Sequence, residues 1–482
     1  MRRRFAPHQL AAFKYALRET HPALFMEMRL RKTSICIRRC QLYGRGGKFL
    51  VIAPGSALGS WTDELRLEGV ADRDVVIISG TKAQRKKLLR GPGVWYLIHT
   101  EGHRSVPEIS RPGWRWTGVI IDESTSIRNP RAQVTEFCLQ NFRDVEHRWI
   151  LTGTPNPESD MEFFCQMAFL DGQFLGFRNW YQMQHNMYHP HWSGERRPNA
   201  DTSRRIAQAV RKRAFVLSRA TAGFPDRKVV DLRWLELPDA LRTTYARAEK
   251  GFVLEWEGRQ TASTIWATGV YLWLRRLCGG FLVEQEPAMT NPAGDDPCLD
   301  GEEGDTILVT HLRQIWAGKV DELVRLLTTE LARKQVVVWF CFNAELSAAE
   351  QSLKSAKVKC ASLTGQIPRE AREQLRQRFM AGDIRVLLVQ EKVAALGMNL
   401  SCADTAIYFS EPPGLLSSKQ TEDRILQLDK VNPLLLIYLL VKNSVDQDIH
   451  EALRMKAIRS RQGLGQELLR RLLRRNHARQ SN

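Results

Sequence analysis

The stretch VIIDESTSIRNP, residues 119–130, indicates the fold of this 482-residue chain more clearly than any other segment. Its first residues are apolar and β-branched, which predicts a buried strand, and the strand ends at two adjacent acids, Asp122 and Glu123. Ligands bind at the carboxyl edge of parallel sheets, so this position favours a ligand-binding role for both carboxylates. The alternative is an acid pair that only caps the following helix.

Similar strand-like runs lie on both sides of this stretch. They are short, apolar and ended by glycine, proline or polar residues: FLVIAP (49–54), VVIIS (75–79), VWYLIH (94–99) and HRWILTG (147–153). Helical patterns at 7–19 and 131–142 alternate with them. Such alternation predicts an α/β fold in which helices cover a parallel sheet.

The same alternation returns after a different middle part. From about residue 317 a helical pattern (319–333) is followed by strand-like runs at 335–342, 384–391, 405–411 and 434–441, with a further helix at 369–379. The middle includes a helical stretch at 239–259 and an acidic segment at 284–305 that is typical of an exposed loop. The sequence therefore predicts two α/β halves that flank an irregular, largely helical insertion.

The charge points to a polyanionic partner. The chain has 71 Lys and Arg against 53 Asp and Glu, a formal balance of +18 and a pI near 9.7. Nucleic acid is favoured over a membrane, because the chain has no run of about 18 apolar residues. An arginine-rich proteome is the alternative explanation. Nine cysteines without a CxxC pair fit a reducing cytosol better than disulfides or structural zinc.

The C-terminal tail carries much of this charge. QELLRRLLRR can form a basic helix suited to phosphates, with the cations Arg470, Arg471, Arg474 and Arg475. A solvated helix face is an equally weighted alternative.

A candidate phosphate-binding loop lies near the N-terminus. In MRLRKTS (28–34), Lys32 and Thr33 precede a predicted helix, where backbone N–H groups, a lysine and a hydroxyl can hold nucleotide phosphates and Mg²⁺. A Lys-Thr pair alone is a weak signal for a phosphate site. The prediction is strengthened because this loop, the acids at 122–123 and ILTGTP (150–155) follow one another in the right order along the chain. In that arrangement Asp122 would hold Mg²⁺ through a water molecule, and Glu123 would polarise the attacking water.

In this order, the motifs resemble the SWI/SNF-type branch of superfamily 2 helicases over residues 5–455, most closely the compact versions carried by bacteriophages and prophages. FAPHQ (5–9) resembles the adenine-recognising motif and MRLRKT the phosphate motif. LVIAPGSALGSWTDEL (50–65), DEST and LTGTP resemble the next three. In the second half, LTGQIPREAREQLRQRF (363–379), VAALGMNLSCADTAIYF (393–409) and KQTEDRILQL (419–428) resemble the phosphate-approaching motif, motif V and motif VI.

The resemblance implies two RecA-like lobes. An N-terminal ATP-binding lobe is expected at 1–220, a linker with a helical insertion at 221–315, a C-terminal lobe at 316–455 and the basic tail at 456–482. ATP and Mg²⁺ are the implied ligands. The implied nucleotide-binding residues are Gln9, Arg29, Arg31, Lys32, Thr33, Ser34, Gly397 and Gln420, with Lys32, Asp122, Glu123 and Arg424 catalytic and Thr33 and Asp122 on the metal. The implied nucleic-acid contacts are Pro54, Thr152, Thr154, Thr364, Gly365, Asn399 and the four tail arginines.

Three positions depart from the family pattern. Arg29 and Arg31 stand where the phosphate loop normally has glycine, and a side chain hinders the close approach of backbone to phosphate. Gln427 stands where motif VI has its second arginine, and an arginine finger contributes about 10³–10⁵ in rate. These departures predict a slow ATPase, or none.

Two functions remain open on this reading. The first is an ATP-dependent translocase on duplex DNA, including branched or forked DNA. The second is a nucleotide-responsive DNA clamp with weak or no hydrolysis. A monomer is expected, alone or as the motor of a replication, recombination or restriction assembly, in the cytoplasm of a bacterial or phage-infected cell and not at a membrane.

Overall fold

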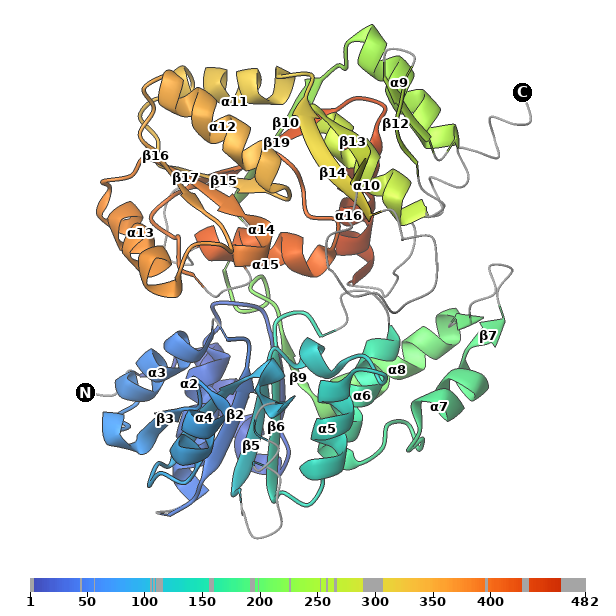
Figure 1. Cartoon of the computed structure of the whole chain (residues 1–482). Coiled ribbons are helices and arrows are strands. Elements are labelled where there is room, and N and C mark those ends of the chain that lie inside the picture. Colours follow the sequence, from blue (N-terminus) through green and yellow to red (C-terminus); the bar gives the residue numbers. More distant parts are fainter. Residues whose placement is uncertain are drawn as a thin grey trace, which may run out of the picture.

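The computed structural model describes most of the chain. The described residues are 4–43, 46–55, 57–104, 106, 109, 116–155, 160–190, 196–197, 199–224, 227–251, 253–256, 259–263, 267–288, 307–394, 398–426 and 433–460. They form two α/β lobes, one from each half of the chain (Figure 1).

The first lobe is built on a parallel sheet in the order β3-β4-β2-β5-β6-β1-β9. Its strands are β1 (Ala23–Met26), β2 (Phe49–Ala53), β3 (Val75–Ile77), β4 (Trp95–His99), β5 (Gly118–Asp122), β6 (His147–Thr152) and β9 (Phe215–Leu217). Five of them match the predicted runs. The remaining two, β1 and β9, are four and three residues long and were not among the predicted runs.

Helices cover both faces of this sheet, because each face carries its own apolar core. On one face α1 (Pro7–Arg18), α2 (Lys32–Cys40) and α3 (Ala57–Leu67) pack against the strands. The other face is covered mainly by α5 (Gln133–Asn141), α6 (Phe163–Asp171) and α8 (Ala200–Arg213). The remaining elements are α4 (Lys82–Leu89), α7 (Trp180–Met187) and the short hairpin of β7 (His189–Pro190) and β8 (Arg196–Arg197).

The second lobe has a parallel sheet in the order β10-β19-β18-β15-β17-β16. Its strands are β10 (Lys228–Leu235), β15 (Val336–Phe340), β16 (Cys360–Leu363), β17 (Val386–Gln390), β18 (Thr405–Tyr408) and β19 (Leu434–Val441). Its helices are α11 (Gly318–Thr328), α12 (Asn343–Ser355), α13 (Arg369–Ala381), α14 (Glu391–Ala394), α15 (Leu415–Ile425) and α16 (Val445–Ser460).

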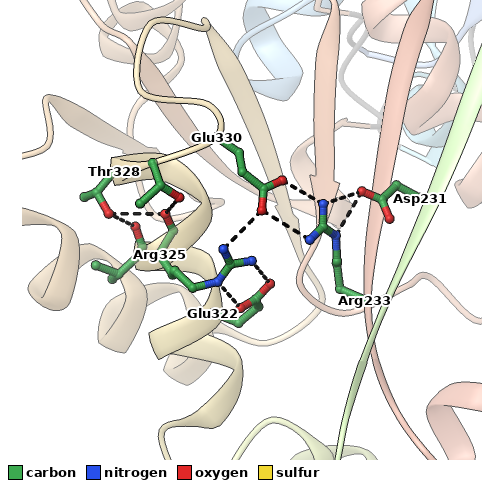
Figure 2. Close-up of polar contacts among 8 residues, drawn as sticks. Asp231, Arg233, Glu322, Arg325, Thr328 and Glu330 are labelled. Carbon is green, nitrogen blue, oxygen red and sulfur yellow. Dashed lines mark hydrogen bonds and ion pairs between the residues drawn. The ribbon is translucent and has the colours of Figure 1, made fainter.

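Strand β10 belongs to this second sheet although it lies inside the segment 221–315, which the sequence assigned to the insertion. All eight of its residues pair with β19. Figure 2 shows how its edge is tied to the lobe: Arg233 binds Asp231 and Glu330, each with 2.7 Å from Nη2 to the carboxylate, and Glu330 also accepts from Arg325. The first strand of lobe two is therefore supplied before the insertion begins.

The rest of the middle part contains helices and hairpins. Helix α9 (Asp239–Gly251) stops before the predicted end at residue 259, because β11 (Val253–Trp256) and β12 (Arg259–Ser263) pair as a hairpin. After α10 (Ala267–Cys278), β13 (Phe281–Ala288) pairs with β14 (Ile307–Gln314). Residues 284–288 of the predicted acidic loop are thus strand, and residues 289–306 lie outside the described part.

The C-terminal boundary also differs from the expected one. Helix α16 continues through residue 456, where the sequence placed the start of the tail, to Ser460. The tail arginines 470, 471, 474 and 475 lie outside the described residues, as do Gly397 and Gln427. Within the described residues, every helix is either too short or too polar to traverse a lipid bilayer.

Candidate functional site

The predicted phosphate loop joins β1 to α2. Two of its residues have left-handed backbone, Arg29 with φ 72° and Arg31 with φ 60° and ψ 47°, and Lys32 begins the helix. This is the conformation that glycine adopts at no steric cost, so the two arginines are held where the family has glycine. Lys32 is buried, and its Nζ donates to the Met26 carbonyl at 3.1 Å. The loop thus places a lysine and the N–H groups of a helix start at the end of β1.

The two acids lie at the carboxyl end of β5. Asp122 is the last strand residue, and Glu123 has left-handed backbone with φ 48°. The Asp122 carboxylate is held on both oxygens: Oδ2 accepts from Trp61 Nε1 at 2.7 Å and Oδ1 accepts from the Glu123 N–H at 3.0 Å. Because β5, β6 and β1 are neighbours in a parallel sheet, the acids share an edge with the phosphate loop.

Glu123 lies among the other predicted site residues. Its Oε2 accepts from Thr152 Oγ1 at 3.0 Å, and Thr152 Oγ1 in turn accepts from the Thr154 N–H at 3.2 Å. Burial raises the pKa of the Glu123 carboxyl, the positive charges of Lys32 and Arg424 oppose this rise, and Asp122 adds to it. A carboxylate of raised pKa between two cations is a group suited to accept a hydrogen bond from water.

The second lobe contributes α15, which lies at the edge of that lobe facing the first (Figure 1). Arg424 is in its last turn and interacts electrostatically with Glu123, while burial lowers the pKa of the Arg424 guanidinium. Gln420 lies one turn earlier on the same helix. Glu123 therefore interacts electrostatically with Lys32 and Asp122 of its own lobe and with Arg424 of the second lobe.

Arg29 also reaches across this boundary. Its Nη2 lies 3.2 Å from the carbonyl of Asp423, from the carbonyl of Arg424 and from Asn399 Oδ1, and its Nε lies 3.3 Å from the Asp423 carbonyl. The side chain predicted to bind nucleotide is thus directed at lobe two.

Other predicted residues take local roles in this structure. The Gln9 side chain accepts from the Ala6 N–H at 2.9 Å at the start of α1, and the Ser34 hydroxyl binds Glu68. Thr33 follows Lys32 in the first turn of α2 and is half-buried. Pro54 follows β2.

On lobe two, Thr364 and Gly365 follow β16, where the Gly365 N–H donates to Gln390 Oε1 at 3.3 Å. Within the described part of the chain, no hydrogen bond or ion pair joins Asp122 or Glu123 to any of the residues of this and the preceding paragraph: Gln9, Thr33, Ser34, Pro54, Thr364 and Gly365.

The sequence did not reveal how two side chains, Trp61 and Arg219, support the site. Trp61 was recognised as part of a motif, but its bond to Asp122 spans 61 positions. Arg219 pairs with Glu27 in the phosphate loop (3.4 Å) and with Asp423 in lobe two. Only the charge of Arg219 and its place at the end of lobe one could have suggested this bridge.

The two parallel-sheet α/β lobes have the fold of superfamily 2 helicase cores. The helicase domain of Pyrococcus furiosus Hef shares the fold with a TM-score of 0.51 at 10% sequence identity, covering 93% of this chain and 97% of that one. The SNF2-related domain matches residues 12–270 and the helicase conserved C-terminal domain matches residues 318–428. The chain belongs to the SNF2-related family.

Two relatives illustrate the similarity. The ATP-dependent helicase brm of Drosophila melanogaster is 24% identical over 429 residues, which are 85% of this chain and 26% of that protein. The human helicase-like transcription factor is 22% identical over 540 aligned positions, which cover 91% of this chain and 53% of that protein. The chain thus spans about a quarter to a half of the length of these curated relatives.

Proposed function

We propose that this protein is an ATP-dependent translocase that acts on duplex DNA and hydrolyses ATP at the boundary between its two lobes. The observation that carries the proposal is that Glu123 interacts with Lys32 and Asp122 in its own lobe and with Arg424 from the opposite lobe. A site shared by two lobes can report nucleotide state as a change in lobe arrangement, which is what a stepping motor needs.

Each residue has a distinct part in this proposal. Lys32 and the N–H groups at the start of α2 bind the β and γ phosphates, and Gln9 reads the adenine. Glu123 orients the attacking water, and Arg424 stabilises the charge that develops on the transferred phosphoryl group. Thr152, which binds Glu123 directly, and Thr154 link the nucleotide to the surface that contacts DNA.

The residues present fit a magnesium ion. Asp122 and Thr33 supply the carboxylate and hydroxyl oxygens that Mg²⁺ prefers, and Asp122 is already held in place by Trp61 and by the backbone. When bound, the ion would neutralise phosphate charge.

The family and the charge support DNA as the partner. The balance of +18 favours a polyanion, and Pro54, Thr364, Gly365, Asn399 and the arginines of the tail are the proposed contacts. Replication, recombination or restriction proteins are proposed as further partners. The bacteriophage or prophage origin and the cytoplasmic location stay predictions from the sequence.

Substitution of Lys32 tests this function. Lys32→Ala should abolish DNA-stimulated phosphate release, because it removes the cation next to Glu123 at the start of α2. Lys48, in the connection between α2 and β2, gives a matched control as Lys48→Ala. Unchanged turnover in Lys32→Ala would refute the assignment.

The clamp remains the second candidate, because the side chains of Arg29 and Arg31 occupy a loop that normally has glycine. A clamp would bind ATP and duplex DNA with no phosphate release above background. Measuring release with single-stranded, duplex and branched DNA, beside binding of both ligands, separates the two candidates.

A further inference from the structure

Arg29 closes the C-terminal end of α15 from the opposite lobe. The last carbonyls of a helix have no partner within the helix and carry the negative end of its dipole. Two of these carbonyls, those of Asp423 and Arg424, accept from the Arg29 guanidinium. An arginine is suited to this position because its planar fork donates several hydrogen bonds at once.

The same turn of α15 is held from a second direction. The Asp423 carboxylate pairs with Arg219, whose backbone N–H donates to Glu27 Oε2 at 2.9 Å. Glu27 and Arg29 belong to the same loop, so the phosphate loop contacts the turn both directly and through Arg219. The Arg424 carbonyl also accepts from the Leu400 N–H at 3.0 Å.

These contacts surround the backbone from which Arg424 extends. Its guanidinium interacts with Glu123, and therefore a small shift of the last turn of α15 changes where that charge lies relative to the acids. Misplacement by about 1 Å can cost a factor of about 100 in rate.

We propose that Arg29 is a positioning residue of the inter-lobe site: by binding the Asp423 and Arg424 carbonyls, it fixes the backbone that presents Arg424 to Glu123. Arg29 thus acts through Arg424. The inference rests on the proposed function for its kinetic consequence, but its structural part does not depend on ATP hydrolysis.

A double-mutant cycle tests the kinetic part. Arg29→Ala should lower kcat for DNA-stimulated ATP hydrolysis about 10- to 100-fold with little change in KM for ATP. Combined with Arg424→Ala, it should cause no further loss, because both changes remove the same positioned charge. Arg29→Lys should recover part of kcat, since an ammonium still donates to carbonyls. The control is Arg66→Ala on α3, an exposed arginine that pairs with Asp63 and Asp72.

Two kinetic results would overturn the inference. One is a double mutant that loses the product of both single losses, which would mean that Arg29 acts independently of Arg424. The other is an increase in KM at constant kcat, which would make Arg29 a phosphate ligand only.

Hydrogen exchange without nucleotide tests the structural part. In Arg29→Ala the amides of Leu400 and Leu426, which donate to the Arg424 and Glu422 carbonyls at 3.0 Å, should exchange faster than in the unmodified protein. Amides of the buried strand β15 should be unchanged. If the protein hydrolyses no ATP with any DNA, the proposed function fails while this measurement still decides the inference. Equal exchange at Leu400 and Leu426 in both proteins would refute it.

Discussion

Replacement of Trp61 by phenylalanine tests how the candidate magnesium ligand is oriented. Trp61 is 1% exposed and Asp122 8% exposed, and the bond between them measures 2.7 Å. Phenylalanine keeps an aromatic ring against the apolar core but removes the N–H donor, so Asp122 Oδ2 loses that partner. A hydrogen bond to a charged group contributes about 1.5–3 kcal/mol.

The expected effect follows from this energy. If the full contribution is needed to hold the carboxylate in the transition state, kcat for DNA-stimulated ATP hydrolysis falls about 10- to 100-fold, since each 1.4 kcal/mol is about tenfold in rate. An Asp122 carboxylate held only by the Glu123 N–H should also bind the metal less tightly, so half-maximal activity should require more Mg²⁺. Steady-state phosphate release across a Mg²⁺ titration measures both quantities.

The same lobe offers a matched control. Trp116 is also buried, and its Nε1 donates to the Ile109 carbonyl at 2.7 Å, a bond of equal length to a neutral acceptor. Trp116→Phe should lower the melting temperature but leave the turnover and the Mg²⁺ dependence unchanged. If Trp61→Phe and Trp116→Phe show the same turnover and the same Mg²⁺ dependence, Trp61 does not orient Asp122 for catalysis.

Three further predictions address other parts of the chain. Arg31→Gly should raise turnover and should not lower the melting temperature, because the left-handed backbone at φ 60° costs a side-chain-bearing residue about 1 kcal/mol or more; slower hydrolysis would contradict this. Deletion of residues 461–482, beyond the end of α16, should weaken duplex binding and leave nucleotide binding intact. The slope of log affinity against log salt concentration should flatten by about 0.9 for each phosphate contact that is lost. Fluorescence anisotropy at several salt concentrations measures this slope, and an unchanged slope would rule out a DNA contact of the tail. Burial raises the pKa of Glu345 to about 7, so the folded state binds a proton more tightly than the unfolded state, and the free energy of unfolding should fall as pH rises from about 4.5 to 7. Denaturant melts across this pH range should show a smaller fall for Glu345→Gln. The exposed control Glu370→Gln should leave the fall unchanged.

The long apolar runs were sufficient to predict much of the fold. Strands β2, β5 and β19 are buried on both faces of parallel sheets, so nearly every residue is apolar and the pattern is unmistakable. Strand β1 (Ala23–Met26), the neighbour of β6 in the sheet, was not predicted. The helix expected at 239–259 was too long, because the sequence does not show that Val253–Trp256 finds its partner in Arg259–Ser263.

For the site, the sequence by itself predicted the residue types that take part and their order along the chain. A Lys-Thr pair before a helix, acids at a strand end and an arginine near the chain's end follow from local patterns and from the family resemblance. Parallel pairing then brings the ends of β1, β5 and β6 to one edge, as expected for any such sheet.

Only the tertiary structure decided what holds these residues in place. Trp61 meets Asp122 across 61 positions, and Arg29 meets the Asp423 carbonyl across 394. Neither contact has a local pattern, because periodicity reports only which face of an element is buried and not which distant element covers it. The two arginines that break the glycine pattern were visible in the sequence, but the direction of Arg29 toward the second lobe follows from the packing of the lobes alone.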